Sequence, residues 1–344
     1  MWALSLSAHE VEAVQDLTRE IALEHKSVEN AEFMRRATVY AHELPRRIRQ
    51  FLSDFRLLEP ACGTCLISGY PVDNGRIGKT PSHWKWRLDG EPSLEEQIVF
   101  VLYGCLLGDP FAWATQQDGH LMHDVFPIES NRDEQLSTGS EQDLWWHTED
   151  AFHQHRADYV GLMCLRNLDR VPTMIGGLDL SRLSQEQIDV LFEPRYLITP
   201  DESHSEKNES DLRKRVREHD GDGIIDSAYE EIKKLSCAPL RVPIFFGRRQ
   251  TPYICLDPHF TRPLDDEASR ALNALAQSVD ENMQEIVLQP GDCFFIDNYR
   301  IVHGRKAFKA RYDGTDRWLK RLNLTRDLRK SYGARAGCEM RVIV

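Results

Sequence analysis

The sequence predicts a mixed α/β protein with a mainly β core, an antiparallel sandwich or barrel that carries helical supports. Two amphipathic stretches open the chain, and a series of short apolar runs follows them. Pro, Gly and Asp bound these runs, which is typical of many short strands joined by turns. With 344 residues, 41% of them hydrophobic, the chain can bury a sizeable core. The predicted strands cover residues 64–67, 158–165, 241–246, 252–256, 285–288, 293–296 and 318–324.

Two helices are predicted at the N-terminus. Ser7 and Glu10 fit a capping box, and apolar residues then recur at helical spacing as far as Ile21. A second helical stretch covers residues 31–52, in which Pro45 predicts a kink or break. Two later helical patches, at 184–192 and 265–283, interrupt the strands.

Composition argues against several classes of partner. The chain has 43 basic and 55 acidic residues, a formal charge of -12, and no basic stripe with interleaved aromatic residues. We therefore expect neither nucleic acid nor an anionic membrane as a partner. No stretch approaches the roughly 20 apolar residues of a membrane span, and the N-terminus lacks signal-peptide features. Of the eight cysteines only Cys62 and Cys65 form a CxxC pair, so we expect a cytoplasmic, reduced protein.

Residues 204–223 are almost wholly polar and charged. Such a run predicts a solvated loop, and a mobile lid over a binding site, at about residues 200–225, is the second interpretation.

A candidate metal site follows from one histidine, one glutamate and a distant second histidine. If residues 145–149 end a strand, His147 and Glu149 project from the same face and can reach one ion. His303 lies roughly 150 residues later, after the predicted strand 293–296. Two histidines and one carboxylate form the facial triad of non-haem iron(II), which leaves positions open for a cosubstrate and oxygen. The spacing alone is a weak signal.

Other histidines offer rival ligand sets. His120 and His123 form an HxxH pair, and His153 and His155 form an HxH pair. A zinc site built from His147, His153 and His155 is conceivable, but these residues crowd into one short segment without a separate anchor. We expect the additional histidines to be surface or supporting residues.

Two arginines near the C-terminus strengthen the iron hypothesis. Arg317 follows His303 by fourteen residues, and Arg321 lies four residues further on, so both share one face of a strand or a helix. A 2-oxo dicarboxylate that chelates iron leaves its far carboxylate to be held, and a guanidinium suits that geometry. One arginine could hold the cosubstrate and the other a substrate carboxylate.

Together with their flanking segments, these motifs resemble those of a known family. The segment 147–173, HTEDAFHQHRADYVGLMCLRNLDRVPT, resembles the metal-binding segment of the clavaminate synthase-like oxygenases. Within these it is similar to the branch that hydroxylates free amino acids, namely the viomycin-pathway arginine β-hydroxylase and the lysine 3- and 4-hydroxylases. The similarity spans most of the chain after about residue 60. Further matching segments are 115–118, 136–140, 252–257, 290–305 and 313–321.

The resemblance implies a double-stranded β-helix (jelly-roll, cupin-like) core with flanking helices and a lid. It implies one oxygenase domain over residues 1–344, with 1–60 as a helical support and 61–344 as the core. The implied cofactor is Fe(II), and the implied cosubstrates are 2-oxoglutarate and O2. A free amino acid is the expected partner, and the oligomeric state stays open.

The resemblance also implies roles for individual residues. His147, Glu149 and His303 correspond to the iron ligands, and Arg317 to the clamp for the distal carboxylate of 2-oxoglutarate. Arg321 matches the residue that holds the substrate α-carboxylate. The positions that match the amino-acid pocket are Gln116, Ser137, Glu149 (for the ammonium group), Asp201 on the lid and Asp257 at the side-chain end.

The acidic residues of the expected pocket indicate the class of substrate. Asp201 and Asp257 in one pocket call for a cationic side chain, because a buried carboxylate is costly unless it is paired. This favours arginine, lysine or a close analogue over asparagine. The arginine pattern has two acidic residues on the strand that ends at Asp257, whereas here the earlier position is Cys255, as in the lysine enzymes. The choice between arginine and lysine stays open.

Glu149 indicates the reaction type. Related halogenases need a small residue at the carboxylate position, so an intact glutamate favours hydroxylation, at C3 or C4 of the side chain, with desaturation as a less frequent outcome. Two other functions remain as alternatives: a redox-inert zinc hydrolase that uses the same residues, and a metal-free binding scaffold. The zinc hydrolase has no use for Arg317 and predicts activity without oxygen, whereas the scaffold predicts no loss of metal on His147→Ala.

Overall fold

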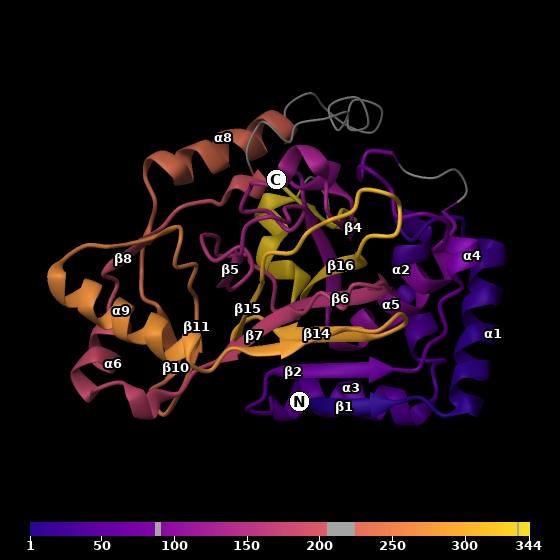
Figure 1. Cartoon of the computed structure of the whole chain (residues 1–344), viewed down its shortest axis with the longest axis horizontal. Helices are drawn as coiled ribbons and strands as arrows, with labels where there is room; N and C mark the ends of the chain where they lie inside the picture. The colour runs from indigo at the N-terminus through magenta and orange to yellow at the C-terminus, as the bar shows by residue number, and fades with distance from the viewer. Residues whose placement is uncertain (87–90, 205–223, 336) are drawn as a thin grey trace.

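A large sheet forms the centre of the molecule in the computed structural model, which describes residues 1–86, 91–204, 224–335 and 337–344 (Figure 1). Its order is β1-β2-β14-β6-β16-β3-β17, and β4 pairs with the same edge of β16 as β3. Pairing is antiparallel except between β1 and β2 and between β17 and β3. The strands are β1 (Trp2–Ser5), β2 (Thr64–Ser68), β3 (Asp109–Trp113), β4 (Met122–Val125), β6 (Tyr159–Arg166), β14 (Cys293–Asp297), β16 (Trp318–Thr325) and β17 (Val342–Ile343).

A smaller antiparallel sheet lies against one face of the large one. Its order is β13 (Gln284–Ile286), β7 (Thr173–Gly177), β15 (Ile301–Arg305) and β5 (Leu144–His147). Buried side chains of both sheets form one apolar cluster, in which Leu162 and Leu319 of the large sheet join Ile175 and Ile301 of the small one. The two sheets therefore face each other, and the space between them continues beyond this cluster as a pocket.

Helices cover the other face of the large sheet. They are α1 (Ala8–Glu24), α2 (Ala31–Ala41), α3 (Arg46–Leu58) and α5 (Leu94–Leu107), which lie together at one end of the molecule (Figure 1). The capping box of Ser7 and Glu10 is present, and the chain breaks at Pro45 between α2 and α3, so both predictions are confirmed. The sequence analysis missed α5. Its side chains are apolar nearly all round, so no helical stripe marks it, and it is buried among the other helices and the sheet.

A second apolar cluster lies at the opposite end (Figure 1). The predicted helical patches are present as α6 and α9, which pack on each other. Short strands complete this region in two small sheets, β12-β8-β9 and β10-β11. The bounds are α6 (Gln185–Leu191), α8 (Ile224–Cys237), α9 (Asp266–Asp280), β8 (Tyr196–Ile198), β9 (Arg241–Val242), β10 (Phe245–Arg248), β11 (Thr251–Ile254) and β12 (Thr261–Pro263), with a one-turn helix α4 (Asn74–Ile77) elsewhere.

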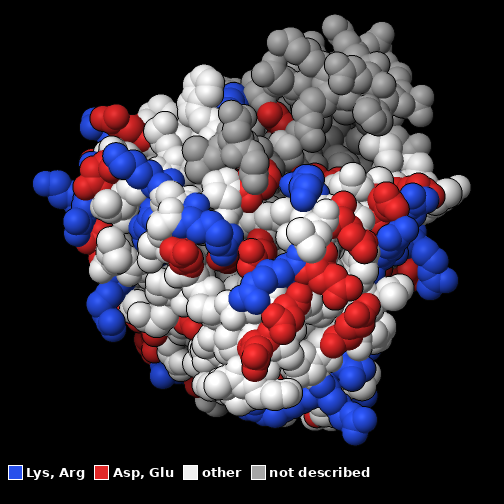
Figure 2. Space-filling view, turned by 90° about the vertical axis from the view of Figure 1, so that its right-hand side faces the viewer, with Lys and Arg blue, Asp and Glu red and all other residues white. Residues whose placement is uncertain are grey.

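The protein is thus a mixed α/β protein built mainly around sheets, as predicted. Every predicted strand overlaps an observed one, although 241–246 is split into β9 and β10. Most of the predicted lid, 205–223, lies outside the described residues. All eight cysteines are without disulfides, and no helix among the described residues is long and apolar enough to cross a membrane. On the face shown in Figure 2, the described basic and acidic side chains are interspersed.

Gly161 in β6 lets α5 pack closely on the large sheet. A Cβ atom at this position would lie 2.9 Å from ring atoms of both Phe100 on α5 and Phe295 on β14. We expect Gly161→Ala to lower the free energy of unfolding by about 1–3 kcal/mol, because neither ring can move in a filled core. Urea unfolding followed by circular dichroism measures this change. Gly333→Ala is the control, since nothing lies within 4 Å of its added methyl group. Equal stability of the two variants would contradict this account.

Candidate active site

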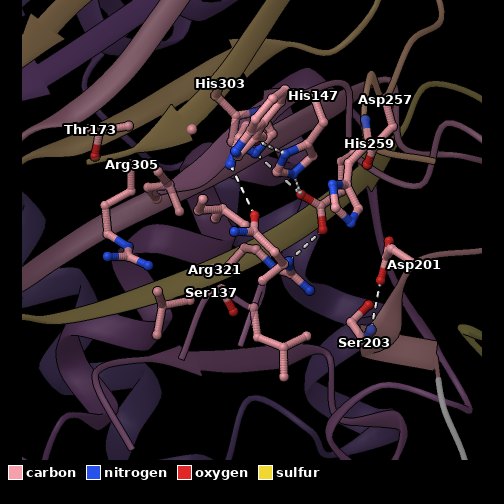
Figure 3. A pocket seen from close by; sticks show the side chains of 18 of the residues that line it. Ser137, His147, Thr173, Asp201, Ser203, Asp257, His259, His303, Arg305 and Arg321 are labelled. Carbon is pink, nitrogen blue, oxygen red and sulfur yellow. Dashed lines mark hydrogen bonds and ion pairs between the residues drawn. The ribbon is translucent and has the colours of Figure 1, made fainter. Parts of the chain in front are cut away.

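A pocket of about 840 Å³ opens between the two sheets. The large sheet contributes Leu319 and Arg321 of β16, and the small sheet contributes His303 and Arg305 of β15 (Figure 3). Further strands of both sheets and several loops supply the remainder of the wall, including the loop that carries Asp257. The pocket therefore lies where strands distant in sequence meet.

Strand pairing brings the two predicted histidine ligands together. His303 on β15 is the cross-strand partner of His147 on β5, and their ring centroids are 4.7 Å apart. Glu149 lies two residues beyond the end of β5. Its Oε2 atom is 3.2 Å from His303 Nε2 and 3.7 Å from His147 Nε2. One ligand atom from each residue lies within 4.8 Å of the others, which suits a single ion.

Backbone contacts hold this triad in place. His147 Nδ1 is 2.8 Å from the carbonyl oxygen of Trp145, and donation there leaves Nε2 available as the ligand atom. The fully buried Asn298 accepts from the Glu149 backbone N–H at 2.7 Å and donates to its carbonyl at 3.0 Å. The next residue, Asp150, has a positive φ of 50°, which turns the chain sharply after Glu149. Asn298 thus fixes the short segment that presents the carboxylate.

Glu149 is ionised although it is buried. Burial opposes its charge, but the nearby Arg321 guanidinium and the hydrogen bonds from His147 and His303 outweigh it and hold the Glu149 pKa well below its usual range. Arg321 donates to Glu149 Oε1, so the ion pair joins β16 of the large sheet to the end of β5 in the small sheet. The site is therefore charged and preorganised before any ligand enters.

Three side chains orient Arg321. Besides Glu149, its Nη2 atom lies 3.0 Å from Gln116 Oε1 and 2.8 Å from His123 Nδ1. Burial and the Arg321 charge lower the His123 pKa well below its usual value, so His123 is neutral and accepts from the guanidinium. Arg321 Nε has no partner among the described residues. We did not predict this role for His123, which the sequence analysis placed only in an HxxH pair.

Arg317 lies deeper in the pocket beside a second guanidinium. It donates to Thr173 Oγ1 at 2.9 Å, and its buried Nε atom has no partner among the described residues. Burial lowers its pKa to about 10, and burial together with the Arg317 charge lowers the pKa of Arg305 to about 10. Within the described part of the chain, Arg305 donates only to the backbone carbonyls of Ser140, Gln142 and Lys306. None of the ion pairs among the described residues involves either arginine. Two buried cations without a carboxylate fit an anionic ligand.

Arg305 and Thr173 were missed by the sequence analysis. The sequence did contain a signal for Arg305. It lies two residues after His303, and residues two apart in a strand project from the same face. Thr173 is the last residue of the segment that carried the family resemblance, but nothing local marks it as a pocket residue.

Carboxylates line the other side of the pocket. Asp257 accepts from the backbone N–H groups of His259 and Phe260, and burial raises its pKa. Asp201 lies nearby and accepts from the backbone N–H of Ser203 at 2.7 Å (Figure 3). Ser137 lines the same pocket, whereas Gln116 lines an adjoining cavity of about 420 Å³ that shares Ser137 and Arg321. All nine predicted site residues therefore lie in or beside one connected space.

The rival ligand sets are not assembled among the described residues. His120 lies 3.6 Å from Glu29, and His153 packs against the rings of Trp113 and His155. A second group of possible ligands, Asp150, Asp201 and His204, was not predicted. Its members already bond to each other and to the protein: His204 contacts Asp150 at 3.0 Å and Thr115 at 2.6 Å.

Comparison with known proteins agrees with this geometry. A family model described as taurine catabolism dioxygenase TauD, TfdA family, matches residues 88–323. The chain belongs to this family. It is 43% identical to enduracididine beta-hydroxylase of Streptomyces hygroscopicus and 44% identical to L-ornithine/L-arginine 3-hydroxylase of Catenulispora acidiphila, with 100% of each chain covered.

Solved structures of one oxygenase are similar over the whole chain. The non-heme iron oxygenase OrfP in complex with Fe, succinate and (3S)-hydroxy-L-Arg has a TM-score of 0.92 at 46% identity, covering 99% of both chains. OrfP with Fe and alpha-ketoglutaric acid has a TM-score of 0.86 at 46% identity, covering 99% of this chain and 100% of OrfP. The predicted dioxygenase class and its resemblance to amino-acid hydroxylases are confirmed, and neither the zinc hydrolase nor the metal-free scaffold is supported.

The unpaired Arg317 leads to a testable expectation. Arg317→Met should weaken 2-oxoglutarate binding to the metal-loaded protein by roughly 30-fold or more, because truncating one partner of a buried charge pair costs at least about 2 kcal/mol. Isothermal titration calorimetry measures this affinity. Arg19→Met, at an exposed position on α1, is the matched control. An unchanged affinity in Arg317→Met would remove Arg317 from the cosubstrate site.

Proposed function

We propose that this chain is an Fe(II)- and 2-oxoglutarate-dependent hydroxylase of a free basic L-amino acid: arginine, lysine or a close analogue. Hydroxylation occurs at C3 or C4 of the side chain, with release of succinate and CO2. One observation carries the substrate class: guanidinium groups lie along one side of the triad's pocket and carboxylates along the other (Figure 3). An amino acid with a cationic side chain complements both sides. The relatives named for arginine and enduracididine favour arginine.

The residues present fit both iron and 2-oxoglutarate. Two imidazoles and one carboxylate within reach of one point form the donor set that iron(II) oxygenases use. When bound, the iron and 2-oxoglutarate activate O2 for insertion of one oxygen atom into a C–H bond. Arg317, Thr173 and Arg305 provide the donors and the positive charge for the distal carboxylate of the cosubstrate. An intact Glu149 at the metal favours hydroxylation over halogenation.

The main-chain end of the substrate belongs at Arg321. Its guanidinium retains an unpartnered Nε atom, and Gln116 and His123 hold it in a fixed orientation for a substrate carboxylate. Ser137 lies in the same wall, and the Glu149 carboxylate beside Arg321 is placed to attract the substrate ammonium. These contacts keep the amino acid in one orientation beside the triad, which decides which carbon faces the reacting oxygen.

Asp257 and Asp201 receive the side-chain cation. Burial disfavours the charge on Asp257, so a bound cation restores a favourable partner. Cys255 contributes no second carboxylate on this strand, because its thiol points to the Ala151 carbonyl at 3.1 Å. The two acidic contacts therefore come from different segments, and Asp201 leads into the charged run that we propose as a lid.

The proposed architecture is a double-stranded β-helix in one domain. Its support is the pair of facing sheets with the site between them, together with the likeness to OrfP over the whole chain. Residues 1–60 supply β1 and the helices α1 to α3 that cover the large sheet, and residues 61–344 supply the core. A cytoplasmic location is proposed as well, supported by eight cysteines that form no disulfide.

Succinate release tests the activity. The purified enzyme is incubated with Fe(II), 2-oxoglutarate, O2 and a panel of free L-amino acids, and mass spectrometry detects products heavier by one oxygen atom. Arginine, lysine or a close analogue should couple succinate release to such a product. If none of these amino acids gives a hydroxylated product while 2-oxoglutarate still binds, the substrate proposal fails and the cosubstrate assignment stands.

Asp257→Asn separates charge from shape at the substrate's far end. We expect the KM for arginine to rise about 30-fold or more, since the buried carboxylate then no longer pairs with the guanidinium. Citrulline has almost the same shape as arginine without the charge, so the unmodified enzyme should have a higher KM for it. In Asp257→Asn this difference in KM between the two amino acids should disappear. Steady-state kinetics with both amino acids measure the two ratios. Asp16→Asn on α1 serves as the control, and an equal effect of Asp257→Asn on arginine and citrulline would contradict the charge argument.

A further inference from the structure

A second cavity lies on the helical side of the molecule, away from the candidate active site. It is a groove of about 1020 Å³ between α2, α3 and α5. Its walls carry Arg46, Arg49 and Arg56 of α3 together with His42 at the end of α2, and its lining residues include no carboxylate. Cys105 and Leu106 of α5 and three neutral polar side chains complete the lining. This is a basic groove on a protein whose formal charge is -12.

The arginines of the groove form one stripe along α3. Arg46, Arg49 and Arg56 follow a spacing of three and seven residues, which places them on one face of a helix, with Ser53 between the last two. None of the three takes part in an ion pair or a side-chain hydrogen bond within the described part of the chain, and Nε of Arg49 and of Arg56 is buried without a partner. Arg47 on another side of the same helix pairs with Glu10. The groove's positive charge is therefore uncompensated.

Helix stability does not account for this charge. The N-terminus of a helix carries a partial positive charge, so basic residues there are unfavourable and acidic residues favourable. The first turn of α3 contains Arg46, Arg47 and Arg49 but no acidic residue, and its N-cap, Pro45, offers no side-chain hydrogen bond. Residues that break such a local rule without a compensating contact often belong to a functional site. An anion in the groove would satisfy both the arginines and the helix terminus.

We propose that this groove binds a small anion that carries at least two phosphate groups. Guanidinium forks match phosphate oxygens in a bidentate manner, and the hydroxyl groups of Thr38 and Ser53 add neutral donors. Arg46 and Arg56 are ten residues apart, about 15 Å along the helix axis. One phosphate cannot contact guanidinium groups over that span, whereas the long arginine side chains can converge on the two phosphate groups of a pyrophosphate or a nucleoside diphosphate. The binding site is separate from the proposed hydroxylation and does not depend on it.

The groove and the active-site pocket lie on opposite sides of the large sheet. The helix α5 that forms part of the groove packs on the large sheet, where a Cβ atom at Gly104 would lie 2.9 Å from Leu322 and 3.1 Å from Leu324 of β16. Arg317 and Arg321 face the other side of that sheet, into the active-site pocket. Substitutions in the groove therefore leave the catalytic side chains untouched, and basal turnover serves as a check that a variant is folded.

Calorimetric titration of the iron-loaded enzyme tests the proposal. Saturating 2-oxoglutarate occupies Arg317 and Arg305, so the probe cannot bind there. The probes are inorganic pyrophosphate, ADP and adenosine, with sodium chloride at matched ionic strength. Saturable binding of pyrophosphate assigns recognition to the phosphates, and binding of ADP alone adds a role for the nucleoside, so either result supports the site. Binding of adenosine as tight as that of ADP, or no binding of either phosphate probe, overturns it.

Paired variants locate the binding. The double variant Arg49→Gln and Arg56→Gln should have at least tenfold lower affinity for the probe, with unchanged basal turnover. Arg19→Gln with Arg35→Gln removes the same charge from exposed positions on α1 and α2 and should leave the affinity unchanged. Equal weakening in both pairs would mean that net charge alone attracts the probe. If the groove pair does not fold, Ser53→Asp places a negative charge on the stripe and should abolish binding; retained binding in that variant contradicts the proposal.

Discussion

The ion pair between Glu149 and Arg321 is the contact on which the active site depends. It links the end of a strand in the small sheet to the middle of β16 in the large sheet, across the pocket that the two sheets enclose. Burial alone would disfavour the charge on Glu149, and the adjacent Arg321 guanidinium offsets that cost. The same carboxylate also contacts His147 and His303, so this ion pair ties the triad of the small sheet to the large sheet. A change in the packing of the two sheets would therefore disturb the partner of the Glu149 carboxylate.

The pocket also separates charge by structural element. Its cations, Arg305, Arg317 and Arg321, come from β15 and β16 or their ends, which the core holds rigidly. The carboxylates of Asp201 and Asp257, which form no ion pair with an arginine or lysine among the described residues, come from loops. A ligand that complements both charges must bridge the rigid and the adaptable parts. This arrangement lets the cosubstrate and the main-chain end of a substrate bind to fixed groups, while the side-chain end meets groups that can adjust.

Gln116 connects these two parts through hydrogen bonds. It accepts from Arg321, and its amide group lies 2.7 Å from Ser203 Oγ and 3.1 Å from His204 Nε2, immediately before the charged run. His204 in turn contacts Asp150, next to the metal-site glutamate. The start of the proposed lid is therefore tied to the same side chains that orient the substrate-binding arginine. Occupation of Arg321 and the position of this segment are physically connected.

The sequence by itself determined the chemistry of the site and the local elements. The capping box at Ser7, the break at Pro45 and the short strands follow from local patterns, which persist in the fold because helix and strand periodicities reflect which face is buried. It also indicated His147, Glu149, His303 and the two arginines through motifs and charge. It did not indicate α5, whose uniformly apolar side chains carry no periodic signal.

Only the tertiary structure decided which of these residues meet. The register that sets His303 opposite His147 depends on pairing between strands about 150 residues apart, which no local pattern encodes. The packing of the two sheets placed Arg305 near Arg317, and the pairing of β4 with β16 turned His123 from a possible ligand into a support for Arg321. Likewise, the metal site that the spacing alone indicated only weakly became a compact triad because β5 and β15 pair within the small sheet, and a contact of this range is a property of the folded chain.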